Sequence, residues 1–410
     1  MAIDTNSFAA DNRDLSMFPG EYGYPFFGKT IEFVKDTLAV CADHYERFGP
    51  VSRLDMVKNQ RVLMCLGPEF NEAALFDPHG NFSAAGGYMG SLGGLYPDGM
   101  LLRDGKKHKK TRRASQPAFK TDALRTYVDM LNPIQSRRID ELKPDEEFIF
   151  YDNIQQTLMD VAAKVFIGLD ETSAEAKMLH KIFENINKGL ITPVPYDLPF
   201  STFRKALKSR ESLRNFLVTK IPERRGTELE DMFSRYCNAK DEDENYLEDV
   251  DIDGHIAFLL FAAFDTTTSA LTNILYYLGK NPEWQEKVRD EINNVSSDIP
   301  SYDDMAEMKL TEYVFQETLR FYPSVMILNR RTTRDVEVGG YEIPANTVVM
   351  ISPPFTHRME EWWTNPLEFD PMRFSPDRAE HKRHGFSYIP FGGGAHKCCL
   401  LYTSPSPRDA

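Results

Sequence analysis

The segment that decides the fold is Phe391-Gly392-Gly393-Gly394-Ala395-His396-Lys397-Cys398, close to the end of the 410-residue chain. Three consecutive glycines let the backbone turn tightly and approach a flat ligand closely. If Cys398 opens a helix, the helix dipole and the free N–H groups stabilise its thiolate.

A nucleotide-binding loop is excluded, because neither G-x-x-x-x-G-K-[ST] nor G-x-G-x-x-G is satisfied. A zinc site is disfavoured, since His396, Cys398 and Cys399 lack a partner pair at the usual spacing. A glycine-rich turn with an inert thiol remains the alternative.

Length and composition describe a large, folded, acidic protein. Hydrophobic residues make up 41% of the sequence and aromatic residues 12%, which excludes global disorder. A chain of 410 residues favours two or more lobes over one compact core. The formal net charge of −14 disfavours nucleic acid and anionic lipid as partners.

Three further features predict a cytoplasmic protein with no membrane span. Five cysteines are too few for a disulfide framework in a chain of this length, so a reducing compartment is expected. The N-terminus lacks the charged and apolar regions of a signal peptide. The longest apolar run, residues 256–264, is far shorter than the ~20 residues that a spanning helix needs.

Hydrophobic periodicity predicts a mainly α protein with small β-sheets. The runs 51–57 and 61–66 are strand-like, and Lys58-Asn59-Gln60 between them predicts a hairpin. Apolar residues recur at helical spacing from about residue 121 to residue 294. The section 331–352 is again strand-like, with a turn at Gly339-Gly340.

An acidic run, residues 241–245, resembles the start of a calcium loop. Tyr246 stands where that loop needs glycine, and Ile252 stands where it needs the bidentate glutamate. We therefore expect a solvated connection between helices.

Two pairs of residues are candidates for buried polar chemistry. Glu317 and Arg320 lie three positions apart on one helix face and are able to pair, although E-x-x-R alone is a weak signal. Asp265 and Thr266 interrupt an apolar helix, where a buried acid is costly unless it has a partner or a task. The alternative for the second pair is an aspartate at a helix bend with satisfied hydrogen bonds.

A basic run covers residues 103–113, with seven Lys or Arg residues against the single acid Asp104. His108 and Arg112 within it are four residues apart and share a helix face. A solvated basic face is the usual explanation of such a run, and an anion-binding site is the more specific one.

Taken together and in this order, these segments resemble the cytochrome P450 family of haem-thiolate monooxygenases. The Phe391–Cys398 loop is similar to the cysteine-ligand signature, with His396 in place of the more usual arginine. Glu317 and Arg320 match the E-x-x-R helix, and Pro371-Met372-Arg373-Phe374 matches the P-x-R-F element. Residues 262–267 are similar to the oxygen-activation helix, with Ala263 replacing its common glycine.

The resemblance, which runs from about Phe18 to Cys398, implies a large helical lobe, a smaller β-rich lobe and a haem b cofactor. It makes Cys398 the iron ligand and assigns four further roles. The roles implied by the family are haem contact for Phe391 and His396, propionate binding for His108, Arg112 and Arg330, an ion-pair triad of Glu317, Arg320 and Arg373, and catalytic proton relay for Asp265 and Thr266.

The implied activity is insertion of one oxygen atom of O2 into an apolar substrate by a monomeric enzyme. Electrons would come indirectly from NAD(P)H through a separate ferredoxin and ferredoxin reductase, since the sequence shows no flavin or iron–sulfur motif. The basic residues that would dock an acidic electron donor are Lys106, Lys107, Lys109, Lys110 and Arg113.

Two alternatives stay open on the same fold: a peroxide-dependent haem enzyme and a non-catalytic haem or lipid carrier. The stretch Pro19–Pro25 is similar to retinoid- and terpenoid-oxidising relatives, so a lipid or terpenoid substrate is expected.

The C-terminal residues depart from the family pattern. The family continues with C-x-G and a long helix, whereas this chain has Leu400 at the glycine position and two prolines, Pro405 and Pro407, that preclude a normal helix. Residues 399–409 also resemble one reading frame of a transposase sequencing adaptor. We therefore expect residues 1–398 to form a P450 domain incomplete at its C-terminus and residues 399–410 to be a non-native tail. The chain as given is then expected to bind haem weakly or to be inactive.

Overall fold

The structure is a computed structural model that describes residues 14–57, 60–143, 146–192, 196–241, 244–295 and 299–399. The chain divides into two compact units. The first, here called the mixed unit, combines Met1–Gly90 with Leu310–Cys398. The second, called the helical unit, combines Ser91–Lys309 with Cys399–Ala410. Each unit is described by itself below.

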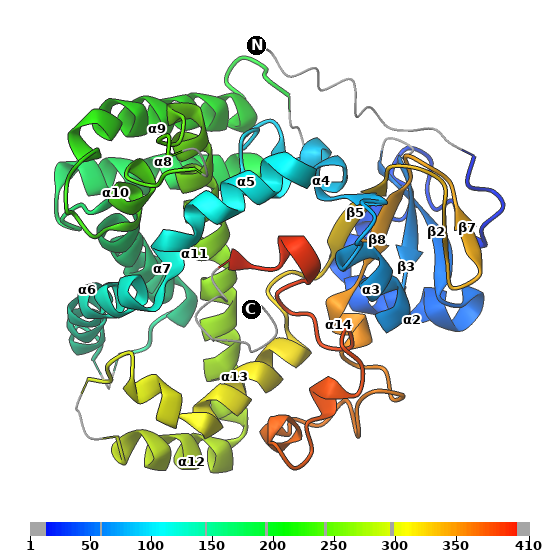
Figure 1. The fold of residues 1–410 in the computed structure, drawn as a ribbon. Helices are drawn as coiled ribbons and strands as arrows, with labels where there is room; N and C mark the ends of the chain where they lie inside the picture. The colour runs from blue at the N-terminus through cyan, green and yellow to red at the C-terminus, as the bar shows by residue number, and fades with distance from the viewer. Residues whose placement is uncertain are drawn as a thin grey trace. The chain divides into compact units, whose positions relative to one another are not determined.

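The mixed unit holds all the strands of the described residues. Six of them form one sheet in the order β1-β2-β3-β8-β5-β4, and two form a separate hairpin, β6-β7 (Figure 1). The strands are β1 (Gly20–Glu21), β2 (Val51–Met56), β3 (Gln60–Cys65), β4 (Phe82–Ser83), β5 (Leu328–Thr332), β6 (Val336–Val338), β7 (Tyr341–Ile343) and β8 (Val348–Ile351). The helices are α1 (Thr30–Lys35), α2 (Thr37–Phe48), α3 (Pro68–Leu75), α4 (Ala84–Leu92), α13 (Lys309–Phe321) and α14 (Pro353–Thr356), with 3-10 turns η7 (Pro371–Phe374), η8 (Glu380–Lys382) and η9 (Gly394–His396).

The sheet follows from the strand-like runs of the sequence. β2 and β3 are antiparallel with Met56 opposite Gln60, which confirms the predicted pairing, although turn residues 58 and 59 lie outside the described residues. The predicted late strands are β5 to β8. The apolar side chains that bury one face of the sheet include Val51, Leu63, Val349 and Ile351. The sheet thus anchors β5, which carries one candidate site residue.

The helical unit accounts for the long stretch of predicted helix. Its helices are α5 (Gly105–Ser115), α6 (Thr121–Asp140), α7 (Phe150–Val161), α8 (Ala174–Leu190), α9 (Thr202–Arg224), α10 (Met232–Cys237), α11 (Asp249–Lys280) and α12 (Pro282–Asn293), with short turns η3 (Met100–Leu102), η4 (Gln116–Phe119), η5 (Ala162–Phe166) and η6 (Asp304–Glu307). α8 packs along α9, and α11 contacts α7, α9 and α10. Leu213, Phe233, Ile252 and Ile256 are buried in its core. The prediction of a mainly α fold with small sheets is confirmed.

The central helix α11 bears on the prediction that the chain has no membrane span. By length and composition alone it is apolar enough to cross a membrane, although its longest uninterrupted apolar run is short. Its buried residues include Asp253 and His255 as well as Leu259 and Leu260. The helix contacts α7, α9, α10 and α12, but only 22% of its apolar window is buried, so the absence of a membrane span stays a prediction.

Two sequence predictions fall partly on residues that are not described. Residues 242 and 243 of the acidic run lie outside the described residues, as do residues 400–410 of the C-terminal tail. Asp241, at the edge of the acidic run, pairs with Lys110 at 3.0 Å, and its carboxylate accepts a hydrogen bond from the Asn245 N–H. The domain boundary at residue 398 stays a prediction.

Candidate functional site

The loop before Cys398 is held in a tight fold by its own backbone. The Cys398 N–H donates to the Phe391 carbonyl over 3.0 Å, and the Lys397 N–H donates to Gly394 over 3.1 Å. Gly394 has φ +60°, and a Cβ there would lie 1.9 Å from the Leu75 carbonyl oxygen on α3. Only glycine fits such a position, so the loop packs directly on the backbone at the end of α3, and we call this close contact the backbone ledge of the loop.

The other predicted residues of this loop are only partly enclosed. His396 and Cys398 are both half-buried, and the Phe391 ring lies 6.5 Å from the ring of Phe315 on α13. A half-buried thiol beside a glycine ledge suits a residue that meets a flat ligand better than one that only fills a core.

Beside the loop, Glu317, Arg320 and Arg373 form fully buried ion pairs. Arg320 Nε lies 2.7 Å from Glu317 Oε2, and Arg373 Nε lies 3.0 Å from Glu317 Oε1. Both guanidinium groups also donate to backbone carbonyls, including those of His357 and Glu368. Every charged group of the network is paired or hydrogen-bonded. The network therefore holds in place the backbone segments whose carbonyl groups it binds.

Sequence reasoning missed the fourth member of this network, Glu380. Its Oε2 lies 3.1 Å from Arg373 Nη1 and accepts the Thr364 N–H over 3.0 Å. Burial would raise the pKa of Glu380, but Arg378 and the Thr364 N–H outweigh it and hold the pKa below its ordinary value. No motif around residue 380 signals this role, since the contact joins elements that only the fold brings together.

His357 was also missed, although it is completely buried beside the network. Its Nε2 accepts the Ile389 N–H over 2.9 Å, and its Nδ1 lies 3.2 Å from the Arg320 carbonyl oxygen. Burial, with the nearby Arg320 charge, lowers the pKa of His357 to about 3, so its ring is neutral. The ring thereby connects α13 to the segment that enters the cysteine loop.

Arg330 lies on β5 and is 5% exposed. Its Nη1 donates to the Asn329 carbonyl over 2.8 Å, and the Asn329 N–H donates to the Tyr88 hydroxyl. Burial raises the pKa of Tyr88, and the Arg330 charge opposes that shift. A buried guanidinium on a rigid strand is well suited to bind a carboxylate.

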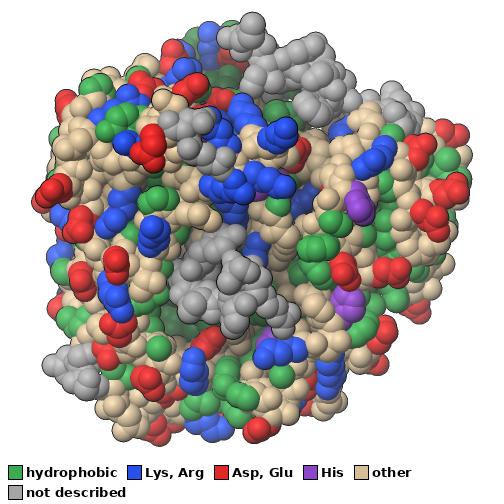
Figure 2. Space-filling model, in the orientation of Figure 1, with side chains coloured by type: hydrophobic (Ala, Val, Ile, Leu, Met, Phe, Trp, Pro, Cys, Tyr) green, Lys and Arg blue, Asp and Glu red, His purple; other side chains and the backbone are tan. Residues whose placement is uncertain are grey.

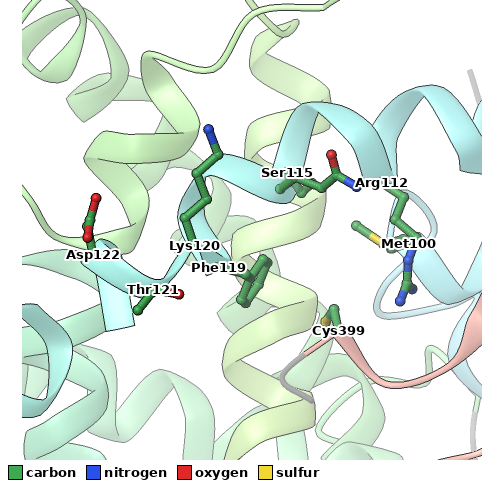
Figure 3. Close-up of a pocket in the computed structure, with 9 residues that line it drawn as sticks. Met100, Arg112, Ser115, Phe119, Lys120, Thr121, Asp122 and Cys399 are labelled. Atoms are coloured by element: carbon green, nitrogen blue, oxygen red, sulfur yellow. The ribbon is translucent and has the colours of Figure 1, made fainter. Parts of the chain in front are cut away.

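In the helical unit, α5 carries the other predicted cations. His108 is buried, and Arg112 is half-buried at the wall of a pocket of about 480 Å³. Arg112 and Met100 lie on one side of this pocket and Phe119 on the other (Figure 3). Cys399 also lines it.

The basic run of the sequence separates into two groups. Arg103 is buried, where it pairs with Asp251 at 2.6 Å and donates to Thr111, so its role is structural. The other Lys and Arg residues of the run are exposed, except Arg112, which is half-buried. Figure 2 shows Lys and Arg side chains gathered over α5. The exposed members are Lys106, Lys107, Lys109, Lys110 and Arg113.

Asp265 and Thr266 lie in the middle of α11. The Thr266 hydroxyl donates to the Ala262 carbonyl over 2.6 Å, four residues earlier in the helix. Asp265 is half-buried, and burial raises its pKa. A carboxyl with a raised pKa next to a hydroxyl is able to hold and pass on a proton.

The structure therefore gathers the predicted residues in two sets. The mixed unit carries Cys398, Phe391, His396, Arg330 and the ion-pair residues, and the helical unit carries His108, Arg112, Asp265 and Thr266. Among the described ranges, no group of three or more His, Cys, Asp or Glu side chains could hold a metal ion. Within the mixed unit, the glycine-rich loop, the half-buried Cys398 thiol and the buried Arg330 guanidinium fit a flat cofactor with carboxylates such as haem.

Comparison with known proteins decides the family. The family model described as Cytochrome P450 matches residues 18–399. The chain belongs to the cytochrome P450 family. It is 32% identical to putative cytochrome P450 136 of Mycobacterium tuberculosis over 92% of this chain and 77% of that protein. It is 29% identical to the taxane 10-beta-hydroxylase of Taxus cuspidata over 93% of this chain and 79% of that protein.

A solved structure agrees with this assignment. Retinoic acid-bound cyanobacterial CYP120A1 matches with a TM-score of 0.83 and 27% identity, over 93% of this chain and 87% of that one. Members of the cytochrome P450 family are haem-dependent monooxygenases, so this P450 is an oxidoreductase.

Proposed function

We propose that this P450 uses haem b to insert one oxygen atom of O2 into an apolar substrate of the lipid or terpenoid class. The observation that carries the proposal is the Phe391–Cys398 loop, in which the packing of Gly394 on Leu75 and the bond from Cys398 N–H to Phe391 fix the backbone that carries the thiol. When bound, haem supplies the activation of O2.

The proposed holders of the haem are Cys398 as iron ligand, with Phe391 and His396 from the same loop. Arg330, His108 and Arg112 are proposed to bind its carboxylates. Burial of Arg330 and His108 supports this, because a charge-assisted hydrogen bond is stronger where water is excluded. The Glu317–Arg320–Arg373 network is proposed to keep the loop in place.

Asp265 and Thr266 are proposed to deliver protons. Burial raises the pKa of Asp265, which increases the fraction of carboxyl that carries a proton near neutral pH. The Thr266 hydroxyl, which donates to the Ala262 carbonyl, is proposed to take part in the same proton transfer. The two side chains are adjacent in the sequence of α11.

The substrate class is supported by an aromatic cluster and by the names of the relatives. In the helical unit, the ring of Tyr96 stacks on Phe261 at 4.9 Å and meets Phe258 at 6.1 Å. Tyr96 is fully buried in the core, and the partly buried rings of Phe258 and Phe261 are proposed to contribute an apolar wall to the substrate site. One relative hydroxylates taxanes and the structural neighbour binds retinoic acid, both of which are largely hydrocarbon.

Electrons are proposed to come from NAD(P)H through a ferredoxin reductase and a ferredoxin. The exposed basic face of α5 would dock the acidic donor, and its attraction would weaken with salt. A monomeric, cytoplasmic enzyme stays the expectation.

The first experiment is the ferrous carbon-monoxide difference spectrum of the full chain, expressed with added haem precursor. A strongly red-shifted Soret band would show that Cys398 ligates iron and that the expected weak haem binding of this chain is wrong. Absence of the band would agree with that expectation, and absence again from a chain with a restored C-terminus would overturn ligation by Cys398. Turnover of retinoic acid and of a taxane is then measured with NAD(P)H and redox partners. Product that requires peroxide instead of NAD(P)H would favour the peroxide-dependent alternative, and haem binding without any product would favour the carrier.

A matched variant separates catalysis from folding. Asp265→Asn keeps the size of the side chain but cannot release a proton, so turnover is expected to fall by about 10² or more with an unchanged carbon-monoxide spectrum. Unchanged turnover in this variant would overturn the proton role of Asp265.

A further inference from the structure

The hydroxyl group of Tyr96 is a buried polar group to which the helical unit gives no partner. Tyr96 is completely buried, and its hydroxyl oxygen makes no hydrogen bond with any of the described residues. An unpaired buried hydroxyl destabilises a fold, so each such group in a folded protein calls for an explanation. The surroundings of this hydroxyl supply one.

The backbone that carries Tyr96 is held closely against α11. A Cβ at Gly99 would lie 2.8 Å from the ring of Phe258, and a Cβ at Gly254 would lie 2.5 Å from the Asp98 side chain. The Gly99 N–H also donates to the Tyr96 carbonyl over 3.1 Å. Two glycines, one on each segment, therefore allow an approach that larger residues would prevent, and the Tyr96 ring has a defined place.

The Tyr96 ring packs on the face of α11 that also carries Asp265. It stacks on Phe261 with the ring centroids 4.9 Å apart and the planes at 23°, and it meets Phe258 at 6.1 Å. Phe258, Phe261 and Asp265 follow one another at intervals of three and four residues, so they share one helix face. Asp265 is therefore the next side chain of that face beyond the stacked rings.

Two charged side chains lie close enough to the Tyr96 hydroxyl to change its pKa. Burial raises this pKa, Arg210 on α9 opposes the shift, and Asp265 adds to it. Arg210 has donors only, and these already bind both carboxylate oxygens of Asp253, at 2.9 and 2.8 Å, and the Leu95 carbonyl. A phenol hydrogen needs an acceptor, and of these two charged groups Asp265 is the one that has acceptor oxygens.

The Asp265 carboxyl group has no competing donor among the described residues. Burial raises its pKa, and no hydrogen bond from another described side chain or N–H counters that shift. Tyr151 on α7 also lies near enough for the Asp265 charge to raise its pKa, after the larger effect of burial. The Tyr151 ring is 43% exposed, however, and its hydroxyl accepts a hydrogen bond from Gln155 over 3.1 Å. The buried donor on this side of α11 is Tyr96.

We propose that Tyr96 is a positioning residue for Asp265, and that its hydroxyl donates a hydrogen bond to the carboxylate whenever Asp265 is ionised. The Asp265 side chain then turns toward Tyr96 along the shared face of α11, and the phenol keeps its proton. A hydrogen bond to the ionised form stabilises that form, so Asp265 releases its proton more readily than burial alone would allow. Tyr96 acts on the reaction only through Asp265.

This inference rests on the proposed proton role of Asp265 and adds the group that receives the carboxylate once the proton has left. Its test requires neither haem nor turnover, because the hydrogen bond is measured on the folded chain itself. Unchanged turnover in Asp265→Asn would overturn the proton role, whereas the results below decide the contact between Tyr96 and Asp265. The two failures are therefore distinguishable.

The test is a pH titration, by nuclear magnetic resonance, of the full chain isotope-labelled at the aspartate carboxyl carbons. The signal that Asp265→Asn removes belongs to Asp265 and gives its pKa. Tyr96→Phe keeps the stacked ring and removes only the donor, so the pKa of Asp265 is expected to rise by about one pH unit or more. The matched control Tyr151→Phe should raise it far less, because water screens an exposed group near the same acid.

Urea denaturation provides a second measurement. The proposed hydrogen bond forms only above the pKa of Asp265, so Tyr96→Phe should lower the urea midpoint there, and by less as the pH falls through that pKa. A hydroxyl that stays unpaired predicts the opposite, namely a variant of equal or greater stability at every pH. Three results would each overturn the proposal: an unchanged or lowered pKa of Asp265 in Tyr96→Phe, an equal shift in Tyr151→Phe, or a stability difference that does not depend on pH.

Discussion

The imidazole of His357 accepts a hydrogen bond at Nε2 from the backbone N–H of Ile389 over 2.9 Å. Its Nδ1 lies 3.2 Å from the Arg320 carbonyl oxygen, so Nδ1 carries the hydrogen and the ring is the neutral tautomer. One side chain therefore joins the buried ion-pair helix to the backbone two residues before Phe391. The loop that presents Cys398 is positioned through this neutral ring as well as through charges.

Replacing His357 with phenylalanine keeps a ring of similar size but removes both polar contacts. The Ile389 N–H would then be buried without an acceptor, which lowers the free energy of unfolding by about 1–3 kcal/mol. Urea denaturation measures this loss. His79→Phe, at an exposed position, should change stability by less than about 0.5 kcal/mol. Equal stability of the two variants would contradict the role of His357.

Glu317→Gln tests the ion-pair network. The substitution leaves Arg320 and Arg373 buried without their shared counter-charge, and we expect a loss of about 3–5 kcal/mol in the free energy of unfolding. The control is Glu286→Gln on α12, which removes a solvent-exposed pair with Arg289 and should leave the urea midpoint unchanged. A Glu317→Gln variant as stable as this control would show that the network does not hold the fold.

The sequence predicts the parts of this molecule that local pattern controls. Strand alternation located β2, β3 and the late strands, and helical periodicity located the helices of residues 121–294. E-x-x-R spacing placed Glu317 and Arg320 within reach of each other on one face of α13. These predictions succeed because neighbours in the sequence determine them.

Contacts between distant segments could not be predicted in this way. Glu380 joins the network through Arg373 and the Thr364 N–H, and nothing around residue 380 signals a buried acid. His357 reaches Ile389 thirty-two positions away, and Arg103 leaves the basic face because Asp251 on α11 pairs with it. Each of these roles depends on two segments that are distant in the sequence and brought together by the fold. The residues around each position in the sequence do not indicate that contact.

The stability of the protein is expected to fall steeply as the pH drops from about 6.5 toward 3. Burial lowers the pKa of His255 and of His357 to about 3, from 6.5. In this pH range the unfolded chain binds protons that the folded chain does not, so acidification favours unfolding. Each histidine contributes up to about 1.4 kcal/mol per pH unit, and its contribution to stability is complete only above pH 6.5.

His255→Phe isolates one of these two groups. Neither ring nitrogen of His255 has a hydrogen-bond partner among the described residues, and Arg103 and His108 disfavour its protonation more than Asp251 favours it. Phenylalanine fills the same space without a buried polar atom, so stability at pH 7 should stay equal or rise by about 1 kcal/mol. Urea midpoints measured between pH 4 and 7 should then depend less steeply on pH than those of the unaltered chain. An unchanged slope would contradict a neutral, buried His255.

Gly394→Ala tests whether the backbone ledge of the cysteine loop is needed. The added methyl group would have to occupy the position 1.9 Å from the Leu75 carbonyl oxygen at a φ of +60°, which is impossible unless the loop moves. We expect a loss of about 2 kcal/mol or more in stability and a weakened or shifted carbon-monoxide difference spectrum. Gly385→Ala is the matched control, because a Cβ at Gly385 meets nothing within 4 Å. If both variants gave the same spectrum as the unaltered chain, the ledge would not position Cys398, and the proposal that this loop holds the haem would lose its main support.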